Sequence, residues 1–270
     1  MLSNRRTVRL DVFADVACPW CFIAKRRLDR VLAVQPEGSV QVRRRAYQLG
    51  PTLPREGVDA RTFFLRKFGG EQQMRRAFAQ VTAIGADEGI AFDFDRMRRA
   101  PNTLLAHQAI VMARGLGCQE QMVDALFRGH FEQGVDVGDL EQVLDLVERH
   151  KVGLHRATLG VMLEHDAALP VVRCDLDAAA RHGVSGVPFF VAEGGLVLTG
   201  AQPSHTLERF LDAARQGRRP AEATAGKPAA TSQGEHSRPT PTRATLAPPG
   251  PARTDQSEAD LARTWRLTGR

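Results

Sequence analysis

The stretch VRLDVFADVACPWCF, residues 8–22, contains the pattern that decides the fold. Val8, Leu10 and Val12 alternate with charged residues, which is the period-two pattern of a strand with one buried face. From Cys18 onward, apolar residues recur at helical spacing. The charged residues that occupy the other side of this helix are Lys25, Arg26, Arg27, Asp29 and Arg30. The pattern therefore predicts a strand that leads almost directly into a helix, with two cysteines at the junction.

The motif Cys18-Pro19-Trp20-Cys21 places two thiols one helical turn apart. Unpaired N–H groups and a partial positive charge at a helix N-terminus stabilise thiolates, and thiols held there have a pKa lowered from about 8.5 to about 3.5–7.5. We therefore expect Cys18 to be the exposed nucleophile and Cys21 the more buried thiol that resolves a mixed disulfide. Pro19 removes a donor that the helix does not need, and Trp20 adds a bulky apolar surface beside the sulfurs.

The rest of the chain adds one parallel strand, a long helical region and a returning hairpin. A strand from Val40 to Tyr47 should lie parallel to the first, with a right-handed crossover. Helical periodicity from about 59 to 169 predicts an inserted helical subdomain, which glycines and Pro101 divide into helices of ordinary length. The elements predicted after it are a helix from Pro170 to about His182, a strand at 189–191, a hairpin partner at 196–199 and a final amphipathic helix containing Leu207, Phe210 and Leu211.

Gly186-Val187-Pro188 comes directly before the returning strand. Proline is tolerated at the first residue of a strand, and cis proline occurs in tight turns, where it serves a purpose. Next to a redox motif, this loop is expected to contain a cis bond before Pro188 and to lie against the two cysteines. The backbone of Val187 would then be available to pair with an extended substrate.

Several motifs, taken in order, carry a resemblance to a known family. They are Asp15-Val16-Ala17-Cys18-Pro19-Trp20-Cys21-Phe22-Ile23-Ala24-Lys25, Tyr47-Gln48-Leu49-Gly50-Pro51, Pro101-Asn102-Thr103-Leu104-Leu105-Ala106-His107, Gly183-Val184-Ser185-Gly186-Val187-Pro188-Phe189-Phe190-Val191 and Gly200-Ala201-Gln202-Pro203. Over about residues 7–215, the chain resembles the DsbA-like thioredoxin family and, more narrowly, its FrnE-type cytoplasmic branch.

The resemblance implies a mixed α/β thioredoxin fold with an inserted all-helical subdomain and dithiol–disulfide exchange with protein substrates through Cys18 and Cys21. The corresponding domains would be residues 1–55 together with 166–217 for the thioredoxin fold, 56–165 for the insertion and 218–270 for a disordered tail.

The resemblance also implies that Asn102, Thr103 and His107 lie on an inserted helix that roofs the site. From spacing alone, Asn102 fits a helix N-cap and His107 is more often a core or surface histidine than a catalyst.

Composition narrows the classes of partner. Nine of the Arg and Lys residues follow Gly217 against five Asp and Glu, which accounts for +4 of the formal net charge of +6. The body of the chain is thus nearly neutral. Its one dense basic run, Arg43-Arg44-Arg45, is interpreted as a solvated strand end, so we expect no nucleic-acid partner.

The chain shows no signal sequence and no apolar stretch of membrane-spanning length, which predicts a cytoplasmic protein without a membrane partner. The tail at 218–270, rich in Pro, Ala and Arg, is predicted to be disordered and could dock a partner.

Four cysteines are too few for a disulfide scaffold, and zinc would need a second close pair of ligands. Cys118 and Cys174 have no such neighbours, so no metal site is predicted. We expect no tightly bound cofactor, with glutathione or a protein dithiol as redox partner. Two other functions stay open: a glutathione-dependent isomerase or transferase of the kappa-class or hydroxychromene-carboxylate isomerase type, and a redox-regulated, chaperone-like binding protein.

Overall fold

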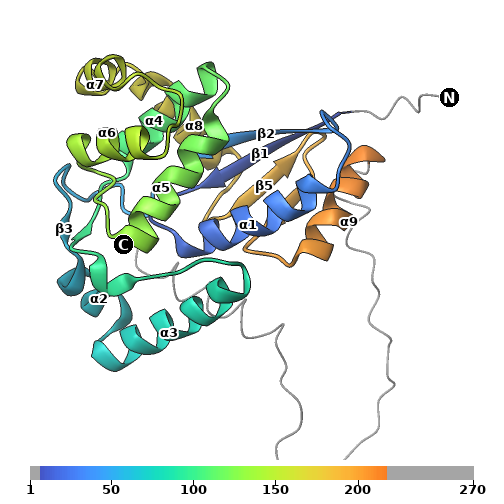
Figure 1. Cartoon of the computed structure of the whole chain (residues 1–270). Helices are drawn as coiled ribbons and strands as arrows, with labels where there is room; N and C mark the ends of the chain where they lie inside the picture. Colours follow the sequence, from blue (N-terminus) through green and yellow to red (C-terminus); the bar gives the residue numbers. More distant parts are fainter. Residues whose placement is uncertain (1–6, 218–270) are drawn as a thin grey trace, which may run out of the picture.

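The computed structural model describes residues 7–217, and its centre is a sheet of strand order β2-β1-β5-β6 (Figure 1). The strands are β1 (Val8–Ala14), β2 (Val40–Ala46), β5 (Phe189–Ala192) and β6 (Val197–Thr199). β2 runs parallel to β1, whereas β5 is antiparallel to both β1 and β6. Two strands far apart in sequence, β1 and β5, are therefore neighbours in the middle of the sheet.

Helices cover both faces of this sheet. Val8, Leu10 and Val12 pack with α1 (Pro19–Ala33) and α9 (Ser204–Arg215) in one apolar cluster. Because side chains alternate along a strand, Phe13 faces the other way and joins a second cluster that includes α8 (Leu169–Arg181). The period-two pattern of the first strand thus describes its two faces correctly.

The region between β2 and α8 is mostly helical. Its elements are β3 (Val58–Asp59), α2 (Ala60–Phe68), α3 (Glu71–Asp87), the 3-10 helix η1 (Phe94–Arg96), β4 (Arg99–Ala100), α4 (Leu104–Gly115), α5 (Gln119–Gln133), α6 (Leu140–Arg149) and α7 (Arg156–Glu164). The prediction of helices throughout was wrong at one point, because β3 and β4 pair as a short antiparallel ladder. Two residues per strand are too few to produce a period-two pattern.

The inserted helices pack directly on the part of α1 that follows the cysteines. The ring of Phe22 stacks on that of Phe127 from α5, with centroids 5.1 Å apart and the planes 1° from parallel, and it meets Phe92 edge-on at 6.0 Å. Gly129 allows α6 to approach α5 closely, because a Cβ at that position would lie 2.6 Å from Leu146. One continuous apolar cluster therefore joins the start of α1 to the insertion.

The sequence predicted the bounds of the sheet strands, of α1 and of α8 to within about two residues, and it predicted α9 without giving its ends. Pro170 lies in the first turn of α8, and the turn at 193–195 connects β5 to β6. The predicted disordered tail at 218–270 lies outside the described residues, and the proposed boundaries of the discontinuous domain remain predictions.

Candidate functional site

Cys18 is the N-cap residue of α1, where the chain turns from extended to helical backbone. Its φ and ψ are −104° and 110°, Pro19 begins the helix, and the Cys18 carbonyl accepts the N–H of Cys21 at 3.0 Å. Cys18 and Cys21 are both free thiols. This placement at the first turn of α1 is the one that the sequence predicts.

The expected exposure of Cys18 was wrong. Cys18 is 2% exposed and Cys21 3%, so burial does not separate the two thiols. Cys18 belongs to a large apolar cluster that also contains Phe64 of α2 and Val187, which comes before β5. Trp20 is also buried rather than open to a substrate, and its indole N–H has no hydrogen-bond partner within residues 7–217.

The loop before β5 lies against Cys18. The Cys18 Sγ atom is 3.7 Å from the backbone oxygen of Val187, and the bond between Val187 and Pro188 is cis. The Pro188 carbonyl accepts the N–H of Gly200, which fixes this loop to the end of β6. The two halves of the predicted site, 169 residues apart in sequence, are therefore in contact.

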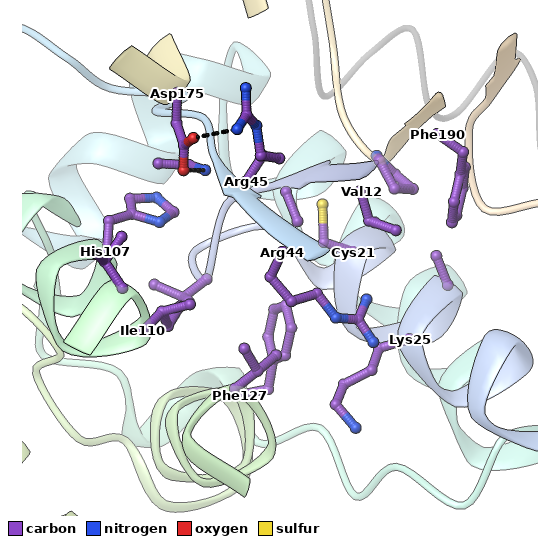
Figure 2. Close-up of a pocket in the computed structure, with 17 residues that line it drawn as sticks. Val12, Cys21, Lys25, Arg44, Arg45, His107, Ile110, Phe127, Asp175 and Phe190 are labelled. Carbon is purple, nitrogen blue, oxygen red and sulfur yellow. Dashed lines mark hydrogen bonds and ion pairs between the residues drawn. The ribbon is translucent and has the colours of Figure 1, made fainter. Parts of the chain in front are cut away.

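Cys21 lines a small cavity, the Cys21 cavity, which is bordered by β1, β2, α1, α4 and α5 (Figure 2). Its volume is about 20 Å³, room for roughly one water molecule. Figure 2 shows Cys21 between the Asp175–Arg45 ion pair on one side and Lys25 on the other. Burial raises the pKa of the Cys21 thiol well above its usual value, and the neighbouring Cys18 sulfur raises it further. Cys21 is thus held as a protonated thiol at neutral pH.

Two cations that the sequence analysis interpreted as solvated, Lys25 and Arg44, are buried in the wall of this cavity. Arg44 is 5% exposed rather than solvated, and its guanidinium binds Glu120 of α5 at 2.7 Å. Lys25 is also 5% exposed, and its Nζ atom lies 2.6 Å from Asp29 and 3.5 Å from Asp124. These side chains are buried because α5 covers the side of α1 and β2 that the charge pattern marked as polar.

The same correction applies to Arg27, which is 7% exposed. It donates to Glu88, the residue after α3, at 2.7 Å and to the carbonyl oxygen of Ala201 at 2.6 Å. Charged residues of α1 therefore attach the first helix to the insertion and to the loop before α9.

Asp15, which the residue pattern did not single out, is a buried carboxylate three residues before Cys18. It accepts the backbone N–H of Leu49 at 2.6 Å and of Ala17 at 3.2 Å, and it lies 3.5 Å from Nε2 of His107. Burial alone would raise its pKa, but the hydrogen bond and charge of His107, with the two amides, outweigh burial and lower it. Asp15 therefore stays ionised and holds the loop after β2 against the loop before α1.

The three residues implied on the inserted helix are buried and structural in their contacts. His107 Nε2 lies 2.9 Å from the carbonyl oxygen of Tyr47; because this oxygen and Asp15 can only accept, Nε2 carries the proton. Asn102 donates to the carbonyl of Leu53 at 2.7 Å. The predicted N-cap is displaced by one residue: Thr103 is the cap residue of α4 and makes no side-chain cap bond, while Asn102 Oδ1 accepts the N–H of Leu104 at 3.0 Å. Asn102 and His107 thus hold the two ends of the loop 47–53.

A larger pocket is lined in part by Ala17, the residue directly before Cys18, and we call it the Lys67 pocket. It has a volume of about 270 Å³ and lies between the 49–53 loop, α2, the segment 100–101 and α5. Its wall includes Ala17, Phe64, Lys67 and His130. Sequence analysis missed both Lys67 and His130, because a lysine after an apolar helical run and a histidine within one carry no motif.

The described residues 7–217 hold no group of three His, Cys, Asp or Glu side chains placed to bind a metal ion. Cys118 is 9% exposed and Cys174 is exposed, and neither belongs to the site. Within the same range, none of the helices has both the length and the apolar character needed to cross a bilayer.

Comparison with known proteins gives matches across most of the chain. The family described as DSBA-like thioredoxin domain matches residues 9–212. The crystal structure of a probable DsbA oxidoreductase from Streptomyces coelicolor is similar, with 30% identity, a TM-score of 0.71 and coverage of 79% of this chain and 92% of that one. The uncharacterized protein YwbO of Bacillus subtilis (strain 168) is 22% identical over 76% of this chain and 96% of its own length. A 2-hydroxychromene-2-carboxylate isomerase structure shares the fold at 18% identity, with a TM-score of 0.58 over 80% of this chain and all of that one.

Proposed function

The chain belongs to the DSBA-like thioredoxin domain family, and from this premise we propose that it is a thiol–disulfide oxidoreductase that exchanges disulfides with protein substrates through Cys18 and Cys21. The observation that carries the proposal is the contact of Cys18, at the N-terminus of α1, with the Val187 carbonyl, while Cys21 lies one turn further along the same helix. Retention of both thiols favours exchange over chemistry that needs only one.

The exchange proceeds in two displacements. The Cys18 thiolate attacks one sulfur of the substrate disulfide, the substrate S–S bond breaks, and the departing substrate sulfur takes up a proton. Cys21 then loses its proton and attacks Cys18, which releases the second substrate sulfur as a thiol. The substrate disulfide gains two electrons, and the Cys18–Cys21 pair is oxidised to a disulfide.

The surroundings of each sulfur suit these two steps. Burial keeps Cys21 protonated at rest, so it does not compete with Cys18 for the incoming disulfide. Cys18 is at a helix N-terminus, where a thiolate is favoured, and the residue directly before it, Ala17, lines the Lys67 pocket. Because Cys18 is only 2% exposed, we propose that a substrate reaches it through this pocket.

The remaining site residues are proposed to shape the route of the substrate. Asn102 and His107 hold the 47–53 loop, which forms one wall of the Lys67 pocket, and Thr103 begins the helix between them. Val187 is proposed to pair through its backbone with an extended substrate, beside Pro188. Pro19 and Trp20 would support the sulfurs from within the core.

We also propose the redox partner and the setting. Glutathione or a protein dithiol would return the Cys18–Cys21 disulfide to the dithiol form, with no tightly bound cofactor, in a cytoplasmic protein of the FrnE-type branch that uses neither nucleic acid nor a membrane. The segment 218–270 would serve to dock a partner. Titration of the Cys18–Cys21 pair against glutathione would give its reduction potential and hence the direction of electron flow.

The direct test uses the full chain in an insulin disulfide reduction assay. Wild type and a Cys118→Ala control should catalyse turnover, whereas Cys18→Ala should abolish it. Cys21→Ala should accumulate a mixed disulfide with the substrate, visible as a mass increase that dithiothreitol removes. Undiminished turnover by Cys18→Ala would contradict the proposal.

Other outcomes point to the two alternative functions. Glutathione-dependent turnover of a small organic substrate that survives Cys21→Ala would indicate an isomerase or transferase. Suppression of aggregation without thiol turnover would indicate a redox-regulated binding protein. Either result would replace the exchange mechanism, because neither needs Cys21 as a resolving thiol.

A further inference from the structure

The Lys67 pocket has a wall that is mostly apolar, with one cation. Phe64, Leu49 and Pro101 line it, and Lys67 is the single Lys or Arg on the part of its wall that the structure describes. The Nζ atom of Lys67 lies 5.8 Å from the centroid of the Phe63 ring. In such a partly desolvated setting a positive charge interacts more strongly with an anion than it would at the open surface.

Lys67 is also within electrostatic reach of the reactive thiol. Burial lowers the pKa of Lys67, while the charges of Cys18 and Asp15 act in the opposite direction. Lys67 and Ala17, the residue directly before Cys18, line the same pocket, so a ligand bound there lies beside the segment that carries the reactive sulfur. A negative group on that ligand would have a cation near it at the point where exchange takes place.

Asp15 is the one acidic residue on the described wall of the pocket, and its carboxylate is directed to other groups. It is 1% exposed, and its oxygens accept the N–H groups of Ala17 and Leu49. Its negative charge is also stabilised by the proton on His107. Repulsion of an anion by Asp15 is therefore reduced by these donors.

His130 supplies a second, different requirement. Its Nδ1 atom lies 3.1 Å from the carbonyl oxygen of Val135, which can only accept, so Nδ1 carries the ring proton. Burial lowers the pKa of His130 to about 4, so the ring is neutral at pH 7 and Nε2 holds a lone pair. Within residues 7–217 this buried Nε2 atom has no hydrogen-bond partner. A ligand with an N–H or O–H donor would satisfy an acceptor that is otherwise costly to bury.

The size of the pocket limits the occupant. Its volume of about 270 Å³ is slightly below the roughly 300–1,000 Å³ of pockets that enclose drug-sized ligands. It therefore suits one or two amino-acid residues rather than a folded segment.

We propose that the Lys67 pocket binds the substrate residues that flank the reactive disulfide. It selects a substrate with a carboxylate and an N–H or O–H donor beside the reactive cysteine. This inference rests on the proposed function and specifies its substrate class.

Two small disulfides that differ in charge test the inference. N,N′-Diacetylcystine carries a carboxylate beside each sulfur, and its bis-amide is the uncharged match; both have amide N–H donors. The reduced full-length protein is mixed with each, quenched in acid, and the Cys18–Cys21 disulfide is measured by mass spectrometry. Each rate is divided by that of dithiothreitol with the same disulfide, which removes differences in intrinsic reactivity.

We expect wild type to prefer the acid about tenfold, which corresponds to a modest charge interaction. Lys67→Met should bring the preference close to one, Lys67→Arg should retain most of it, and the exposed control Lys151→Met should leave it unchanged. The preference should also fall as salt is added. A general change in the reactivity of Cys18 would alter both rates and leave their ratio intact.

His130→Phe tests the second requirement. It should slow both disulfides by a similar factor of a few-fold and leave the acid preference intact, because it removes an acceptor and not a charge. Equal normalised rates in wild type, or a preference that survives Lys67→Met, would overturn the inference while leaving exchange itself in place. Failure of Cys18 to react with either disulfide would instead contradict the proposed function.

Discussion

Cys18 and Cys21 lie one turn apart on α1 and are equally buried, yet the spaces beside them differ more than tenfold in volume. The Lys67 pocket, which is lined by Ala17 directly before Cys18, measures about 270 Å³, whereas the cavity that Cys21 itself lines measures about 20 Å³. The Lys67 pocket has a cation and an unsatisfied imidazole nitrogen in its wall. The Cys21 cavity has in its wall two cations, Lys25 and Arg44, that form ion pairs with residues of α5. The comparison teaches that exposure alone does not rank two thiols, and that the adjoining space and its charges do.

The largest expected effect is on thiol reactivity. In a background with Cys118→Ala and Cys174→Ser, the Cys21→Ser variant retains Cys18 alone and the Cys18→Ser variant retains Cys21 alone. We expect iodoacetamide to modify Cys18 about 100-fold faster or more at pH 7. The Lys67 pocket reaches Ala17, directly before Cys18, whereas Cys21 is protonated beside a cavity of only about 20 Å³. The rates can be followed by mass spectrometry at intervals after mixing.

The pH dependence sharpens this test. Because burial raises the pKa of Cys21, its modification rate should still be climbing about tenfold per pH unit above neutrality. Equal rates for the two single-thiol variants at pH 7 would remove the distinction between the two environments.

The second effect concerns His130, which lines only the larger pocket. Its pKa is lowered from 6.5 to about 4, so between these values the unfolded chain binds a proton that the folded chain does not. Its contribution to stability is therefore fully present above about pH 6.5 and is lost as the pH falls toward 4. The change should amount to about 3 kcal/mol in the free energy of unfolding.

Urea denaturation at several pH values measures this effect. His130→Phe should flatten the curve between pH 6.5 and 4, while the same substitution at the exposed His205 should not. An unchanged slope in His130→Phe would mean that another group dominates proton uptake in this range.

The smallest effect compares two aspartates near the same strand. Asp15 is 1% exposed and is held by two backbone amides and His107, whereas the Asp11 carboxylate pairs with the half-exposed Arg43 on the surface. Asp15→Asn should lower the free energy of unfolding by about 2 kcal/mol at pH 7. Asp11→Asn should lower it by less than about 1 kcal/mol.

The sign of the pH effect at Asp15 follows from its lowered pKa. Its contribution is present above the unfolded value of about 3.9 and is lost as the pH falls through the lower folded value. Wild type and Asp15→Asn should therefore approach each other in stability below about pH 4. A constant gap at low pH would show that packing, not charge, accounts for the difference.

Local pattern was sufficient for most of the fold and for the two cysteines. The alternation around Leu10 and the helical spacing after Cys18 depend on neighbours in sequence, so these elements could be predicted. The burial of Lys25 and Arg44 could not, because both are covered by α5, whose residues follow nearly a hundred positions later along the chain than Lys25. Charged residues next to an apolar pattern were interpreted as solvated. The carboxylates of α5 that offset the cost of burying Lys25 and Arg44 cannot be identified from the sequence pattern.

Lys67 and His130 were missed for a related reason. Each belongs to an ordinary helical run, and only the packing of α2 and α5 around the 49–53 loop brings them to one pocket. Sequence alone located the two cysteines, which belong to a short motif. It did not reveal the surroundings that distinguish one sulfur from the other, because these are assembled from segments far apart in the sequence.

The pairing of β1 with β5 has a consequence for the order in which the molecule is completed during synthesis. A growing chain that has emerged only as far as α7 already carries both cysteines and the whole insertion. It still lacks the strand that completes the centre of the sheet and the carbonyl that meets the Cys18 sulfur. Translation must therefore continue to about residue 192 before the thiol site can close, and a truncated nascent chain would carry the same two sulfurs without that closure.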